Sequence, residues 1–167
     1  MELGFRCSCC GELHAELPMA FHLEAPVYWS PEMADSPDCE LTSDQCVINR
    51  EHFFVRGLIE IPVLDSKESF VWGVWVSLSE KSFAHISDRW QTEGREHDDP
   101  YFGWLSSALD YDPSTLNLAT NLHSRPVGVR PFIELEPTDH PLAVEQRNGI
   151  TLARVQEIAE RALHPNN

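Results

Sequence analysis

The chain has 167 residues, of which 42% are hydrophobic and 23% are charged, the composition of an ordinary globular protein. Asp and Glu number 27 against 12 Lys and Arg, which gives a formal net charge of −15. Nucleic acids and anionic lipids are bound by clustered positive charge, and this sequence has no Lys/Arg stripe, which argues against both partners. No apolar run approaches the roughly 20 residues of a membrane span.

The length predicts a single domain over residues 1–167, with a Cys-rich knuckle at 1–16, a Pro-rich irregular segment at 17–43 and a core at 44–164. The first residues, MELGFRCSCCGE, lack the basic start and apolar run of a secretory signal. We therefore expect a cytoplasmic protein.

The Cys-rich unit contains the spacing C-x-x-C between Cys7 and Cys10, followed by Gly11. Two thiolates at this spacing grip one zinc ion in zinc knuckles, and glycine permits the tight turn. Cys7 and Cys10 are the predicted ligands of a structural zinc. The third and fourth ligands would come from His14, Cys39, Cys46 and His140, of which His14 and Cys46 are the ones we predict. A second C-x-x-C is absent, so the same thiols also fit redox chemistry or buried cysteines without a role.

Residues 17–43 hold four prolines, which predicts mostly irregular chain. Tyr28 and Trp29 should keep this segment on the domain. The acidic part at 32–40 is expected to be a solvated loop.

The most regular stretch of the chain follows, and it predicts a β-hairpin over residues 53–78. β-branched and aromatic residues alternate on both arms, FFVRGLIEIPVL and FVWGVWVSL, around a polar turn. A short strand at 44–50 leads into the hairpin. Gly57 and Gly73 interrupt the arms and indicate a bulge or a close contact.

The second half contains both helices and strands. A helix is predicted over 79–93 with Ser79 as its N-cap, and a short helix or turn over 101–109 with Trp104 facing inward. Two strands follow, around Leu116–Leu122 and Val129–Leu135, each with one buried face. His140 and Pro141 suggest a turn. The last helix is expected to begin after Thr151.

Together these elements predict an α+β fold. An antiparallel sheet of about four to six strands would be covered by the C-terminal helix and the helix near 80–92, with the Cys-rich knuckle at one end.

Catalytic patterns are weak. A nucleophile with a base and an orienting group is not visible, and neither G-x-G-x-x-G, a P-loop, H-E-x-x-H nor G-x-S-x-G occurs. The alternative of an enzyme, such as a metal-dependent hydrolase, would place its site near His52, Arg56 and His140. Among the five tryptophans, Trp75 points away from the apolar face of its strand and is the best candidate for a groove or interface.

Four stretches spread over about residues 5–160, and they are FRCSCCGELH, SDQCVINREHFFVRGLIEIPV, FVWGVWVSLSE and RPFIELEPTDHPLAVEQRNGIT. In order and spacing they resemble a family of bacterial proteins, the domain of unknown function 2199 family. The resemblance implies one domain that includes the cysteine unit and the hairpin, and it implies no activity, cofactor or catalytic residue.

The sequence therefore favours a binding module without catalytic residues over an enzyme. The negative charge would attract a basic protein partner. Zinc is the only cofactor that the residues suggest.

Overall fold

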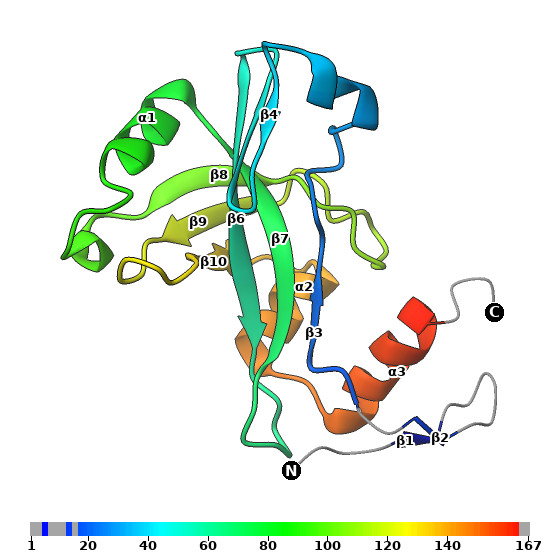
Figure 1. Ribbon diagram of the computed structural model, residues 1–167. Coiled ribbons are helices and arrows are strands. Elements are labelled where there is room, and N and C mark those ends of the chain that lie inside the picture. The colour runs from blue at the N-terminus through cyan, green and yellow to red at the C-terminus, as the bar shows by residue number, and fades with distance from the viewer. Residues whose placement is uncertain (1–4, 7–12, 15–16, 164–167) are drawn as a thin grey trace.

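The computed structural model describes residues 5–6, 13–14 and 17–163, and shows a mixed α+β fold (Figure 1). The first strands are β1 (Phe5–Arg6), β2 (Leu13–His14), β3 (Ala20–His22), β4 (Glu40–Leu41) and β5 (Gln45–Ile48). They are followed by β6 (His52–Ile61), β7 (Phe70–Leu78), β8 (Tyr101–Leu105), β9 (Ala119–His123) and β10 (Phe132–Leu135). The helices are α1 (Glu80–Asp88), α2 (Pro141–Asn148) and α3 (Leu152–Leu163), with 3-10 turns η1 (Pro31–Asp35) and η2 (Arg95–His97).

Five of these strands close into a barrel. Hydrogen-bonded neighbours run β6–β7–β8–β9–β10, and β10 returns to pair with β6. Because strands that follow one another antiparallel reverse direction each time, the first and the fifth point the same way, and β10 pairs with β6 in parallel at Phe132 and Leu58. The predicted simple antiparallel sheet is therefore wrong in topology, since closure joins its two edges.

Additional strands extend the barrel from β6 and β7, which are ten and nine residues long. β3 pairs with β7 in parallel, with Phe21 opposite Trp72. On the other side β5 pairs antiparallel with β6, and β4 with β5. The hairpin of β6 and β7 runs the length of the molecule in Figure 1 and is the element on which the others are built, which confirms the predicted hairpin.

The main core fills the barrel with the inward side chains of its strands. Gly57 allows this packing, because a Cβ there would come 2.6 Å from Cδ1 of Ile133 on β10. The expected close contact at this glycine is confirmed. The largest fully buried side chains in the barrel include Val55, Ile59, Ile61, Phe70, Val74, Val76, Leu105, Leu122 and Ile133.

A second core covers the outer face of the hairpin. Trp75 is fully buried there with Cys46, Ile48 and Phe54. Its indole N–H donates to the carbonyl oxygen of Leu23 at 2.9 Å. The prediction that Trp75 lies at a groove or interface is wrong, because the irregular segment that includes Trp29, Met33 and Leu41 covers this face.

The helices begin at side-chain caps. Ser79 accepts the backbone N–H of Ser82 at 3.1 Å at the start of α1, and Thr151 accepts that of Arg154 at 3.2 Å at the start of α3. Both caps confirm the predictions. The N-cap of α2 is His140, with Pro141 in the first turn, so the predicted turn at this place is wrong.

Two further predictions are corrected by the pairing of the strands. Residues 101–105 form β8 rather than a helix or turn, and β9 begins at Ala119, three residues after the expected Leu116. Among the described residues, none of the helices combines the length and apolar composition of a bilayer span.

Candidate interaction surface

Two aromatic side chains stand on the outer face of β8. Tyr101, Gly103 and Leu105 point into the barrel, which leaves Phe102 and Trp104 outside with 48% and 47% of their surface exposed. The two rings meet edge to face, with centroids 4.9 Å apart. Aromatic side chains of this size are normally buried, so an exposed pair is an informative surface feature.

Two depressions lie beside the aromatic pair and share Ser77 and Leu78 of β7. The smaller, of about 340 Å³, is lined by Phe102 and Trp104 themselves together with the start of α1. The larger, of about 520 Å³, is lined by Tyr28, Ile48, Asn49, Glu51, His52, Phe53, Phe54, Ser77, Leu78, Ser106 and Asn117. The shared residues place the two depressions next to each other. We call the two together the aromatic surface and define it by Tyr28, Phe102 and Trp104.

Tyr28 is 47% exposed and reaches this surface from the irregular segment. Its ring lies 6.0 Å from that of Phe54. The neighbouring Val27 donates its backbone N–H to the carbonyl oxygen of Ser106 at 2.9 Å, which ties the segment to the chain just after β8. The expectation that this segment lies on the domain is confirmed by these contacts.

The charge of the aromatic surface is negative. Glu51 lines the larger depression and is exposed, and no Lys or Arg is among the described residues that line either depression. Glu80 follows in the first turn of α1, also exposed. Neither carboxylate takes part in an ion pair within the described chain.

The sequence carries a signal for this pair. The letters YFGWL alternate in the manner of a strand, which puts Phe102 and Trp104 on one side, and the predicted inward position of Trp104 is wrong because residues 101–105 form a strand and not a helix. In most half-buried strands the apolar side chains alternate with polar ones and so mark the inner face. Here the outer positions also carry aromatic side chains, so the alternation alone does not tell which face is inside.

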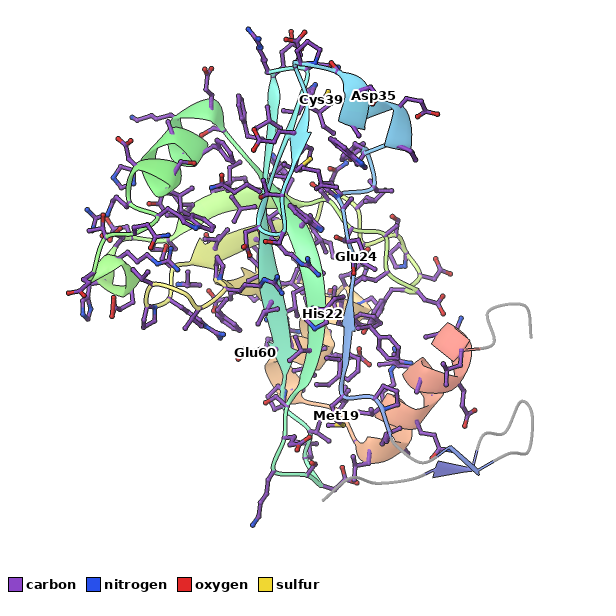
Figure 2. All side chains as sticks on the ribbon, in the orientation of Figure 1. Met19, His22, Glu24, Asp35, Cys39 and Glu60 are labelled. Carbon is purple, nitrogen blue, oxygen red and sulfur yellow. The ribbon has the colours of Figure 1, made fainter. Side chains whose placement is uncertain are left out.

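The predicted zinc ligands stay untested. Cys7 and Cys10 lie outside the described residues, as does most of the Cys-rich knuckle. In Figure 1, β2, which carries His14, lies at the same end of the molecule as α3, whereas β5, which carries Cys46, lies toward the opposite end. Figure 2 marks that end by Cys39 and the α3 end by Met19. In the part of the chain that the structure describes, no three His, Cys, Asp or Glu residues gather as a metal site would require.

Cys46 is enclosed rather than reactive. Its thiol is 1% exposed in the second core. Burial, with a smaller contribution from Cys39, raises the pKa of Cys46 to about 12, because the thiolate is poorly solvated there.

The residues of the alternative enzyme site have separate structural roles. His140 accepts the backbone N–H of Leu142 at Nδ1, so its Nε2 carries the proton and donates to the carbonyl oxygen of Pro113 at 2.8 Å. His52 is exposed at the start of β6 and lines the larger depression. The contacts of these residues do not converge on a common point, and the enzyme interpretation gains no support.

Arg56 is the most unusual of the three. It is 6% exposed on the outer face of β6, with its guanidinium 5.9 Å from the ring of Trp75. Its Nη1 donates to the carbonyl oxygen of Ser43 at 3.2 Å, and its Nε has no partner among the described residues. Burial and then nearby Arg130 lower the pKa of Arg56, and the carboxylates of Glu24 and Asp44 oppose this shift. Figure 2 shows His22 of β3 and, just after the strand, Glu24.

A comparison with protein families identifies the family to which the chain is similar. A family model described as an uncharacterized protein conserved in bacteria, DUF2199, matches residues 6–150. Comparisons with curated proteins and with solved structures find no match. The resemblance stated from four stretches of the sequence is thus confirmed, and the assignment carries no activity with it.

Proposed function

Because this chain belongs to the DUF2199 family of uncharacterised bacterial proteins, which assigns it no activity, we propose from its surface that it is a binding module for a basic segment of another protein. The aromatic surface is the docking site. The observation that carries the proposal is the half-exposed pair Phe102 and Trp104 beside an acidic depression, on a chain of net charge −15.

Aromatic side chains supply most of the binding free energy at many protein interfaces, because they bury large areas with little loss of rotamer freedom. Their faces also attract cations. A Lys or Arg of the partner could lie over Trp104, and other basic groups of the segment could pair with Glu51 of the larger depression or with Glu80 of α1. The overall field would steer such a segment toward the protein and repel acidic competitors.

The test begins with peptides displayed from a random library and selected on the immobilised full-length chain. We expect enriched sequences to carry Lys or Arg beside an apolar residue. Titration of an enriched peptide should show Trp104→Ala weakening binding by about 2 kcal/mol, or about 30-fold, as for an interface tryptophan. Higher salt should weaken binding to the wild type.

A matched control is Leu64→Ala. Leu64 is 69% exposed in the turn between β6 and β7, at the opposite end of the hairpin from residues that line the aromatic surface, and its substitution should leave the affinity unchanged. Enrichment of acidic peptides, or equal affinities for wild type and Trp104→Ala, would refute the proposal.

The structural zinc also stays a proposal. The spacing of Cys7 and Cys10 supports it. A metal there would stabilise the segment before β3 and would not contact the partner. The cytoplasmic location expected from the sequence likewise remains a prediction.

A further inference from the structure

A separate cavity of about 470 Å³ lies between β3, β7, the chain after β8 and α3. Most of its wall is apolar. The lining side chains are Phe21, Leu23, Trp72, Ala108, Leu109, Ile158 and Ala162, with Asp110, Arg154 and Arg161. This size and this mixture of an apolar wall with a few charged groups are typical of sites for small molecules.

The walls of the cavity are joined by one chain of hydrogen bonds. The indole N–H of Trp72 donates to the hydroxyl of Tyr111 at 3.2 Å, and that hydroxyl donates to Oε1 of Glu145 at 2.5 Å. Nε of Arg154 donates to Oε2 of the same carboxylate at 2.7 Å. The chain links β7, the segment after β8, α2 and α3, and it fixes the side chains of Trp72 and Arg154, which line the cavity.

Tyr111 stays a donor in this chain. Burial, followed by the hydrogen bond to Glu145, raises the pKa of its hydroxyl far above the ordinary value for tyrosine. The guanidinium of Arg154 lies 5.5 Å from the Tyr111 ring. The same hydrogen-bond network thus positions Arg154, a charged residue of the cavity, and Trp72, a residue of its apolar wall.

The charge of the cavity differs from that of the chain as a whole. Two arginines and one aspartate line it, although acidic residues outnumber basic ones more than twofold in the sequence. Arg161 pairs with Asp110 through Nε at 2.8 Å and Nη2 at 3.2 Å, and this ion pair is exposed. Arg154 uses Nε and Nη1 for Glu145 and Glu157.

Each arginine keeps an unused donor. Within the described chain, Nη2 of Arg154 and Nη1 of Arg161 make no hydrogen bond. A hydrogen bond from a guanidinium N–H to a carboxylate is charge-assisted and stronger than one between neutral groups. A ligand with an apolar body and one carboxylate could therefore lie against the apolar wall and accept from a free N–H donor of these arginines.

We propose that this cavity binds a small apolar monocarboxylate. The apolar body lies against Trp72, Leu109 and Ile158, and the carboxylate lies at Arg154 and Arg161. Asp110 competes for Arg161, so it limits the affinity. This site is independent of the aromatic surface.

The test is a calorimetric titration of the full-length chain with three probes that share one alkyl chain, namely decanoate, decan-1-ol and decylammonium. We expect decanoate to bind about tenfold more tightly than the alcohol, because only the carboxylate can accept from the guanidinium groups, and the ammonium to bind most weakly. Absence of decanoate binding, or equal binding of the three probes, would overturn the proposal.

Variants at the exposed ion pair separate charge from apolar contact. Arg161→Gln should weaken the affinity for decanoate by about tenfold and leave the affinity for decanol unchanged. Asp110→Asn should raise the affinity for decanoate. Equal effects of Arg161→Gln on the acid and the alcohol would contradict a carboxylate site.

A bulky side chain at the cavity provides the matched steric control. Ala162→Phe places a ring into the cavity from the exposed end of α3 and should remove binding of decanoate. Ala153→Phe adds the same ring at an exposed position of α3 that does not line the cavity, and it should bind like the wild type. Wild-type affinity in Ala162→Phe, with an unchanged melting temperature, would place the ligand elsewhere and overturn the inference.

Discussion

Gly103 determines how closely β8 approaches β7, and so where Phe102 and Trp104 lie. A Cβ at Gly103 would come 2.3 Å from Cγ1 of Val76 and 2.6 Å from the carbonyl oxygen of Ser77. The first atom belongs to a buried side chain and the second to the backbone of the neighbouring strand. Gly103→Ala can therefore be accommodated only if the two strands move apart.

The expected effect follows from two opposing contributions. Overpacking of a barrel interior lowers the free energy of unfolding by about 1–3 kcal/mol. Because the added methyl group of Gly103→Ala would meet backbone, which cannot rotate away, we expect a loss of about 3 kcal/mol from this contribution. Replacing glycine returns about 0.5–1 kcal/mol, because alanine has less backbone freedom to lose on folding. The net loss should be about 2 kcal/mol, equivalent to a fall in Tm of about 4–8 °C for a chain of this size.

Urea unfolding followed by circular dichroism measures this loss, with a lower midpoint and an unchanged slope. Gly57→Ala is the matched control in the same barrel. Its closest neighbours are Cδ1 and Cγ1 of the buried Ile133, at 2.6 and 2.7 Å, and its closest backbone atom, the carbonyl oxygen of Pro131, is farther away at 3.1 Å. The loss should therefore be smaller than that of Gly103→Ala. A Gly103→Ala protein as stable as the wild type, or a larger loss for Gly57→Ala, would refute the reasoning.

Three other predictions concern the cap, the buried thiol and the metal. His140→Ala should lower the unfolding free energy by about 1–2 kcal/mol in thermal unfolding, because α2 loses its N-cap, and His140→Asn should recover part of it; an unchanged Tm for the alanine variant would contradict the cap. Because the pKa of Cys46 is about 12 in the folded protein and about 8.5 in an unfolded chain, the unfolded state loses its proton first as pH rises. The unfolding free energy should thus fall above about pH 9 by up to about 1.4 kcal/mol per pH unit, and urea titrations of Cys46→Ala should show a shallower fall; parallel pH profiles would disprove this. Elemental analysis of protein purified without chelator should find zinc in a stoichiometric amount, and Cys7→Ser should reduce both zinc content and Tm; if neither changes, the knuckle is absent.

Local patterns in the sequence predicted several elements correctly. The period-two alternation of residues 53–78 was enough for β6 and β7, since each strand buries its inward face whatever its neighbours are. Ser79 and Thr151 were recognised as caps because a cap depends on side chains and backbone only a few residues apart.

The candidate sites were predicted less well, because they depend on which side chains the fold leaves uncovered. Trp75 and Trp104 both sit on outward positions of barrel strands. Trp75 is buried by a segment from before the hairpin, and Trp104 is left half exposed. Alternation within a strand predicts on which face of the sheet a residue lies. It does not predict whether another segment of the chain buries that face.

The sequence by itself determined the long hairpin, the first residues of two helices and the strong negative charge of this protein. The tertiary structure decided that the strands close into a barrel through the parallel pairing of β10 with β6, and that Phe102 and Trp104 stay outside while Arg56 and Trp75 become buried. The physical reason is the range of the interactions: caps and alternation act over a few residues, whereas closure and burial depend on contacts between strands far apart along the chain.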